Sequence, residues 1–113
     1  FCDYVFSADA TQPVPVMEKI AELTNGEMCD ITINNVNITD TEMTSILCTK
    51  NDGLVYFFSM ATSFTKAALG AEGVGSDVTM IVGNGYTKGH AEITLQELRE
   101  SEALRKIFTE LYA

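Results

Sequence analysis

The run Leu54–Phe64, with the sequence LVYFFSMATSF, decides the fold of this chain. Its bulky apolar residues fall on both odd and even positions, so a strand made from it would be apolar on two faces. Such a strand lies in the middle of a sheet, with a helix packed against one face and a cavity or a partner against the other. We therefore expect Leu54–Phe64 to form the central strand.

Two glycine-containing turns predict antiparallel neighbours for this strand. Asn51–Gly53 and Gly83–Gly85 contain residues that tolerate the positive φ values of tight hairpins. The first turn would join a strand at residues 43–49 to the central run, and the second would join residues 78–82 to residues 86–93. The predicted sheet is an antiparallel meander.

The remaining segments predict one more strand and two helices. Residues 29–39 alternate between apolar and polar, and their change of parity at Asn34-Asn35 predicts a β-bulge that bends the sheet. Apolar spacing predicts helices at residues 15–24 and at about residues 94–112, whereas the Ala- and Gly-rich residues 67–76 predict a flexible connection with about one helical turn. The predicted fold class is therefore α+β, with a strongly bent antiparallel sheet.

The composition is that of one globular domain, which we expect to span residues 1–113. It is 46% hydrophobic and 20% charged, and no apolar stretch approaches the roughly 18 residues of a bilayer-spanning helix. The net charge of −9 argues against nucleic acid and membranes as partners, because both attract clustered Lys and Arg. Cys2, Cys29 and Cys48 have neither disulfide-framework nor zinc-site spacing, which favours reduced thiols and a cytoplasmic protein without metal.

His90 and Asp9 are the two candidates for acid–base chemistry. His90 is the single histidine, and on its predicted strand it shares a polar face with Tyr86, Lys88 and Glu92. That face either lines a ligand cavity or is the solvated side of an antiparallel strand. Asp9 lies near an apolar segment, where burial would raise its pKa, although Asp at such a position commonly caps an element.

A set of Met and aromatic side chains indicates either an irregular ligand pocket or an ordinary core. The sequence contains no GxxxxGK[ST], GxGxxG or GxSxG pattern, so neither a phosphate-binding loop nor a nucleophile elbow is indicated. The candidate ligand-binding residues are Tyr56, Phe58, Met60, Met80, Tyr86 and His90.

Five short motifs follow one another in a familiar order: Ser7–Ala10, Met28–Ile33, Ala61–Lys66, Ser76–Val78 and Asn84–His90. In this order the chain resembles the SnoaL-like members of the nuclear-transport-factor-2-like superfamily, which have a cystatin-like fold. The resemblance implies a cone, in which a curved antiparallel sheet wraps around helices and encloses a pocket. Here the first long helix would be cut short at the start of the chain, and a capped C-terminal helix would follow the sheet.

The leading functional prediction is a homodimer, paired through the sheet face, that binds a small apolar or amphipathic molecule without a cofactor. One alternative makes the same pocket an isomerase or lyase site with Asp9 or His90 as the general base. Another is a flavin-binding split β-barrel that holds flavin mononucleotide, which Val55–Phe58 and Gly89–Ile93 also resemble. Thr65 stands where that family has a phosphate-gripping Lys.

Overall fold

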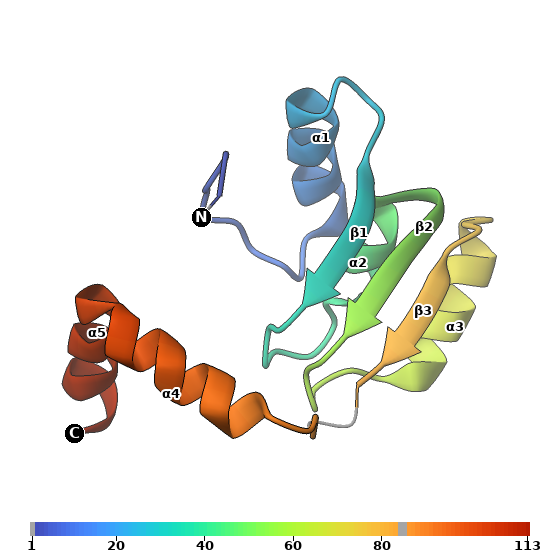
Figure 1. The fold of residues 1–113 in the computed structure, drawn as a ribbon. Helices are drawn as coiled ribbons and strands as arrows, with labels where there is room; N and C mark the ends of the chain where they lie inside the picture. Colours follow the sequence, from blue (N-terminus) through green and yellow to red (C-terminus); the bar gives the residue numbers. More distant parts are fainter. Residues whose placement is uncertain (1, 84–85) are drawn as a thin grey trace.

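A computed structural model describes residues 2–83 and 86–113 as one three-stranded sheet with five helices (Figure 1). Helices α2 and α3 lie behind the sheet in this view, and α4 and α5 extend away from it. The strands are β1 (Cys29–Asn34), β2 (Thr49–Phe57) and β3 (Thr79–Val82). The helices are α1 (Pro13–Leu23), α2 (Glu42–Leu47), α3 (Phe64–Gly73), α4 (His90–Glu100) and α5 (Glu102–Tyr112).

The sheet is parallel, and its strands lie in the order β1-β2-β3. Tyr56 of β2 pairs with Ile33 on one side and with Ile81 on the other, so the apolar run does contribute to the central strand. Only Leu54–Phe57 of that run lies in β2, because residues 58–63 form the loop after it and Phe64 begins α3. The predicted antiparallel meander is wrong. Strands β1 and β2 are each followed by a helix, α2 and α3, that returns the chain to the starting end of the sheet, as parallel pairing requires.

The two returning helices occupy segments that the sequence analysis assigned otherwise. Residues 43–49, predicted as a strand, contain most of α2, and residues 67–76, predicted as a flexible connection, contain most of α3. Ala67 and Ala71 lie four residues apart and are the buried residues of α3, which is the spacing of one helical face. Both helices lie on the same side of the sheet, as connections of one hand between consecutive strands demand (Figure 1).

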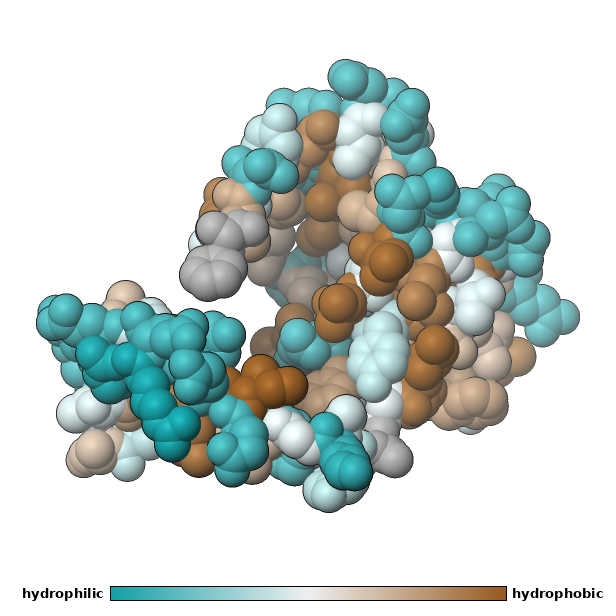
Figure 2. Space-filling model, viewed as in Figure 1, coloured by the Kyte–Doolittle hydropathy of each residue, from teal (hydrophilic) through white to brown (hydrophobic). Residues whose placement is uncertain are grey.

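The alternation of β2 separates two faces of the sheet. Val55 and Phe57 are fully buried beneath α2 and α3, and a buried side chain of this size stabilises the fold by about 2 kcal/mol. The opposite face, which we call the open face, is largely exposed in the described structure and appears as an apolar patch in Figure 2. It consists of Ile31, Ile33, Tyr56, Phe58 and Ile81.

Asn51–Gly53 does not form the predicted hairpin. These residues lie within β2, and the register with β1 shifts between Cys29 and Ile31, so β2 bulges there and then continues in the same direction. Asp52 takes a φ of 63°, which explains why a turn-forming sequence occurs inside a strand. The bulge predicted at Asn34-Asn35 is also wrong, because β1 ends at Asn34.

The C-terminal part is more helical than predicted. The strand predicted at residues 86–93 is wrong, since α4 begins at His90 after Gly89, whose φ is 84°. The hairpin predicted at Gly83–Gly85 falls largely on residues 84 and 85, which lie outside the described residues.

The single helix predicted at about residues 94–112 is two helices. They meet at Ser101, whose hydroxyl accepts a hydrogen bond of 3.2 Å from the Leu104 N–H and so caps the start of α5. Among residues 2–83 and 86–113, no helix combines the length and the apolar character needed to cross a bilayer.

The fold contains both helices and strands, as expected, but it is not the predicted cone. The sheet has three parallel strands and does not close, so the strongly bent antiparallel sheet and the flavin-binding split β-barrel are both wrong. Both predictions had the same cause. Crossover helices were interpreted as strands or connections, and an open parallel sheet was therefore interpreted as a meander.

Candidate functional site

The carboxyl ends of the three strands lie together at one edge of the sheet, which we call the carboxyl edge (Figure 1). In open parallel α/β sheets, ligands bind outside this edge. Here it is formed by the loop after β1 (residues 35–41), the loop after β2 (residues 58–63) and Gly83 directly after β3. We take this edge as the candidate site.

Asn34, the last residue of β1, anchors the first loop. Its side chain is buried and donates hydrogen bonds of 2.9 Å to the hydroxyls of Thr41 and Ser45. Its Oδ1 atom accepts a bond of 3.0 Å from the Val36 N–H. Because a buried amide is costly to leave without partners, these bonds hold the strand end, the loop and α2 in one arrangement.

Glu42 connects the two loops. Its side chain is buried, and its Oε1 atom accepts a hydrogen bond of 2.7 Å from the Ser63 N–H. Ser63 is the N-cap of α3, where its hydroxyl accepts from the Lys66 N–H at 3.3 Å. The Lys66 ammonium also pairs with Asp40, which raises the pKa of Lys66. The first residues of α2 and α3 are therefore fixed to each other.

Tyr56 and Phe58 form an aromatic surface next to this edge. Their rings stack with centroids 6.1 Å apart and planes inclined by 20°. A Cβ added to Gly83 would lie 2.6 Å from the Tyr56 hydroxyl and 2.9 Å from the Phe58 ring, so a side chain at this position would displace these two rings. Phe58 is 46% exposed and Met60 is 100% exposed, which leaves an apolar area open to a ligand.

The structure brings together only some of the predicted ligand-binding residues. Tyr56, Phe58 and Met60 lie on β2 and the loop after it. Met80 packs against the core on the opposite face of the sheet, because it pairs with Val55 instead of Tyr56. It is therefore not placed to share a pocket wall with the aromatic pair.

Tyr86 and His90 form a second group at the start of α4. Their rings meet edge to face with centroids 5.2 Å apart, and His90 Nδ1 lies 2.6 Å from the Thr87 carbonyl oxygen. His90 begins a helix, so it does not share the strand face that the sequence analysis assigned to it. Its use in binding or catalysis stays a prediction.

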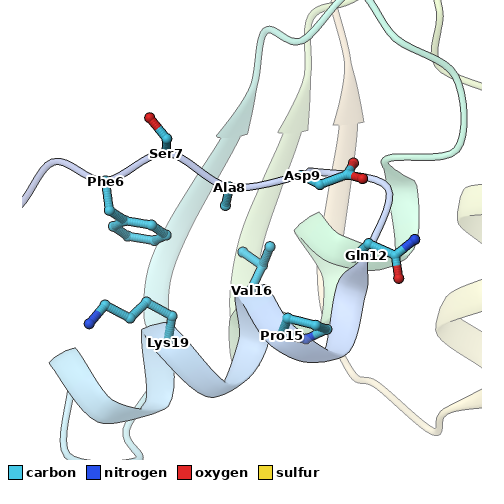
Figure 3. Close-up of a pocket in the computed structure, with 8 residues that line it drawn as sticks. All are labelled: Phe6, Ser7, Ala8, Asp9, Gln12, Pro15, Val16 and Lys19. Atoms are coloured by element: carbon cyan, nitrogen blue, oxygen red, sulfur yellow. The ribbon is translucent and has the colours of Figure 1, made fainter.

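Asp9 lies beside a cleft of about 400 Å³ between the N-terminal segment and α1 (Figure 3). Figure 3 shows Phe6 and Val16 turned toward this cleft and the Asp9 carboxylate turned away from α1. Thr11 donates to Asp9 Oδ1 from its hydroxyl at 2.6 Å and from its N–H at 2.9 Å, and these bonds lower the pKa of Asp9. The geometry is that of a local capping residue, and its use as a general base stays a prediction.

Cys29 and Cys48 adjoin each other at the start of β1 and the end of α2. The Cys29 N–H donates to the Cys48 carbonyl oxygen at 2.9 Å, and Cys48 is buried. Burial raises the pKa of Cys48 to about 11 and also raises the pKa of Cys29, so both are neutral thiols at pH 7. In the described part of the chain, no three His, Cys, Asp or Glu side chains are grouped to hold a metal ion.

Comparison with known proteins gives two extensive sequence matches, and no protein-family model matches the chain. Over 97% of its length the chain is 64% identical to L-erythro-3,5-diaminohexanoate dehydrogenase of Acetoanaerobium sticklandii. Over 93% of its length it is 60% identical to the protein of the same name from Fusobacterium nucleatum. The chain spans about a third of the length of these relatives, 32% and 30%.

These matches overturn the resemblance to the SnoaL-like superfamily. The relatives are named as dehydrogenases, and the parallel sheet has the wrong strand direction for a cystatin-like cone. The motifs behind the resemblance are short and lie mainly at strand and helix ends, where unrelated folds use the same turn-forming residues. The descriptions SnoaL-like, cystatin-like and of unknown function are corrected accordingly.

Sequence reasoning missed the residues that build the carboxyl edge. Asn34 was predicted only as part of a bulge and Glu42 was not singled out, yet both are buried and hold the loops together. The available signal was the short apolar strand that ends in a polar amide and is followed by a helical pattern, which is how a β-strand enters a crossover helix.

Proposed function

We propose that this chain forms part of an enzyme that dehydrogenates L-erythro-3,5-diaminohexanoate, and that it supplies one half of a dinucleotide-binding region. The observation that carries the proposal is the uninterrupted β1-α2-β2-α3-β3 order, with all strands parallel and adjacent. Dinucleotide-binding folds are built from two such halves. The two relatives are named as dehydrogenases, which supports the same function, and the proposed substrate is the one in their names.

The chain fits the second of the two halves. The first half carries the glycine fingerprint GxGxxG, which grips the diphosphate of the coenzyme at a helix N-terminus. This sequence has no such pattern, and its net charge is −9. The diphosphate is therefore assigned to the rest of the enzyme, and this chain would contact the part of the coenzyme beyond it.

The exposed residues of the carboxyl edge suit a nicotinamide coenzyme, which would accept hydride from the substrate. Phe58 offers a ring face and Met60 an exposed thioether, both suited to a planar ring. Gly83 keeps the edge free of a side chain beside Tyr56 and Phe58. The role of this chain would be to bind and orient the coenzyme through these groups.

A chimaeric enzyme tests the proposal. In this protein, called the chimaera below, the 113-residue chain replaces the matching segment of the Acetoanaerobium sticklandii relative. We expect it to dehydrogenate L-erythro-3,5-diaminohexanoate with a kcat within about tenfold of that of the unaltered relative. The absorbance of reduced nicotinamide measures the rate. A folded chimaera that is inactive with every nicotinamide coenzyme would contradict the proposal.

A pair of phenylalanine variants locates the coenzyme. Phe58→Ala should raise the KM for the coenzyme about fivefold, because loss of one aromatic contact costs about 1 kcal/mol. Phe64→Ala is the matched control, since Phe64 is 74% exposed at the start of α3. Equal KM changes in the two variants would place the coenzyme elsewhere.

The functional expectations from the sequence that concern ligands and partners remain predictions. These are a small apolar or amphipathic ligand, an isomerase or lyase reaction with Asp9 or His90 as the base, a homodimer through the sheet face and a cytoplasmic location. The flavin mononucleotide alternative depended on a split barrel and loses its basis with that fold.

A further inference from the structure

The outer edge of β1 exposes backbone groups that are directed away from the sheet. The Asn34 carbonyl oxygen accepts from the Phe58 N–H at 3.0 Å, so the backbone of Asn34 faces β2. Successive residues of a strand direct their N–H and C=O groups to alternate sides. The groups of Ile31 and Ile33 therefore point to the outer edge, and such a row is a template for another strand.

A groove of about 630 Å³ runs along this edge. Ile31 and Ile33 of β1 line it from one side, and Val16 and Ile20 of α1 line it from the other. These four apolar side chains suit the side chains of a β-branched or apolar segment.

The position of α1 indicates that a strand is absent above it. Helix α1 packs against α2 and so continues the helix layer one place beyond β1, as Figure 1 shows. None of its residues is buried, and Val14 is 50% exposed. In layered α/β folds a helix of this layer is covered by a strand, yet no described strand lies beyond β1.

The open face also requires a cover that the described residues do not supply. Ile31 and Ile33 are 59% and 62% exposed, and Figure 2 shows the apolar patch to which they belong. Parallel sheets occur almost only with both faces covered. About two thirds of the length of the relatives lies outside the matched segment, which is enough polypeptide to extend the sheet and cover this face.

We infer that the outer edge of β1 pairs with a parallel, largely apolar β-strand from the part of the enzyme that corresponds to those remaining two thirds. The inference rests on the proposed function only in placing this chain within a longer enzyme. A second copy of the chain is a poorer occupant, because each copy carries a net charge of −9 and like-charged copies repel. The site of pairing is also the place where the order of strands would reverse, beside the carboxyl edge.

Amide hydrogen exchange on the chimaera tests this inference at single-residue level. Thr32 and Asn34 are internal references, because their N–H groups face β2 whether or not a further strand is present. We expect the amides of Ile31 and Ile33 to exchange within about tenfold of these references. Exchange of Ile31 and Ile33 more than about a hundredfold faster than Thr32 and Asn34 would overturn the inference.

The dependence on concentration separates the two occupants. Protection that persists in a monomeric chimaera, checked by light scattering, supports a strand from the same polypeptide. Protection that is lost on dilution from dimer to monomer shows that a second copy pairs with β1 and overturns the inference.

Activity distinguishes the two proposals from each other. An inactive chimaera with Ile31 and Ile33 protected would refute the proposed dehydrogenase function and leave the strand pairing standing. An active chimaera with both amides unprotected would refute the strand pairing and support the proposed dehydrogenase function.

Discussion

The two faces of the sheet carry similar residues in opposite surroundings. Val55 and Phe57 are sealed beneath α2 and α3, whereas Ile31 and Ile33 on the other face are more than half exposed. Apolar content alone therefore does not say which face the 113 residues bury. What differs is that the helices that follow β1 and β2 in the sequence, α2 and α3, both pack on the face of Val55 and Phe57.

The largest difference between the faces should appear in two neighbouring residues. Phe57→Ala should lower the free energy of unfolding by about 4 kcal/mol, because it empties a fully buried site. Tyr56→Ala should lower it by about 1 kcal/mol, since it removes mainly the contact with Phe58. Urea unfolding of both variants of the chain measures this, and equal losses would break the distinction between the faces.

The open face should become sensitive to substitution only in the chimaera. In the chain by itself, Ile33→Asp should cost less than about 1 kcal/mol, because Ile33 is 62% exposed. In the chimaera it should cost about 3 kcal/mol, because a carboxylate would be buried without a partner. Urea midpoints of both proteins, with Ile33→Val as the control, test this. The same small loss in both would show that the face stays uncovered.

The anchoring of the first loop should have an intermediate effect. Asn34→Leu should cost about 2 kcal/mol, because the Val36 N–H and two hydroxyls lose their partner. Asn35→Leu, at an exposed neighbouring position, should change stability by less than about 0.5 kcal/mol. If the two variants unfold at the same urea concentration, the buried amide does not hold the loop.

The smallest effect concerns pH. Burial raises the pKa of Cys48 from 9.0 to about 11, so the folded state retains a proton that the unfolded state has released in this range. Stability from this thiol is present below pH 9 and decreases as the pH rises toward 11. Cys48→Ala should flatten the decrease in urea midpoint over this range, and Cys2→Ala, at an exposed position, should leave it unchanged.

The sequence predicted single elements better than their connections. The helix expected at residues 15–24 is α1, the strand expected at 78–82 is β3, and the first part of the two-faced apolar run, Leu54–Phe57, lies in the central strand. These elements depend on local periodicity, which the sequence records directly. The turn-forming Asn51–Gly53 predicted a hairpin but forms a bulge, because the same residue types serve both structures.

The candidate site was harder to predict for a different reason. Tyr56 and Phe58 were recognised, but Met80 was grouped with them by residue type, before the register that pairs it with Val55 was known. The parity of a residue decides its face only after the register is known. Asn34 and Glu42 were not recognised because their role depends on their burial in the fold. That burial depends on α2 and α3, which the sequence did not predict as helices.

The carboxylate of Glu42 has a consequence for how a ligand would be received. Since this one group on α2 holds the first residue before α3, the loops after β1 and β2 are braced against each other before anything binds. A molecule that arrives between them does not have to order two independent segments, and that saving in conformational entropy favours tighter association. Replacing Glu42 by a side chain that cannot reach Ser63 would therefore make both loops more mobile.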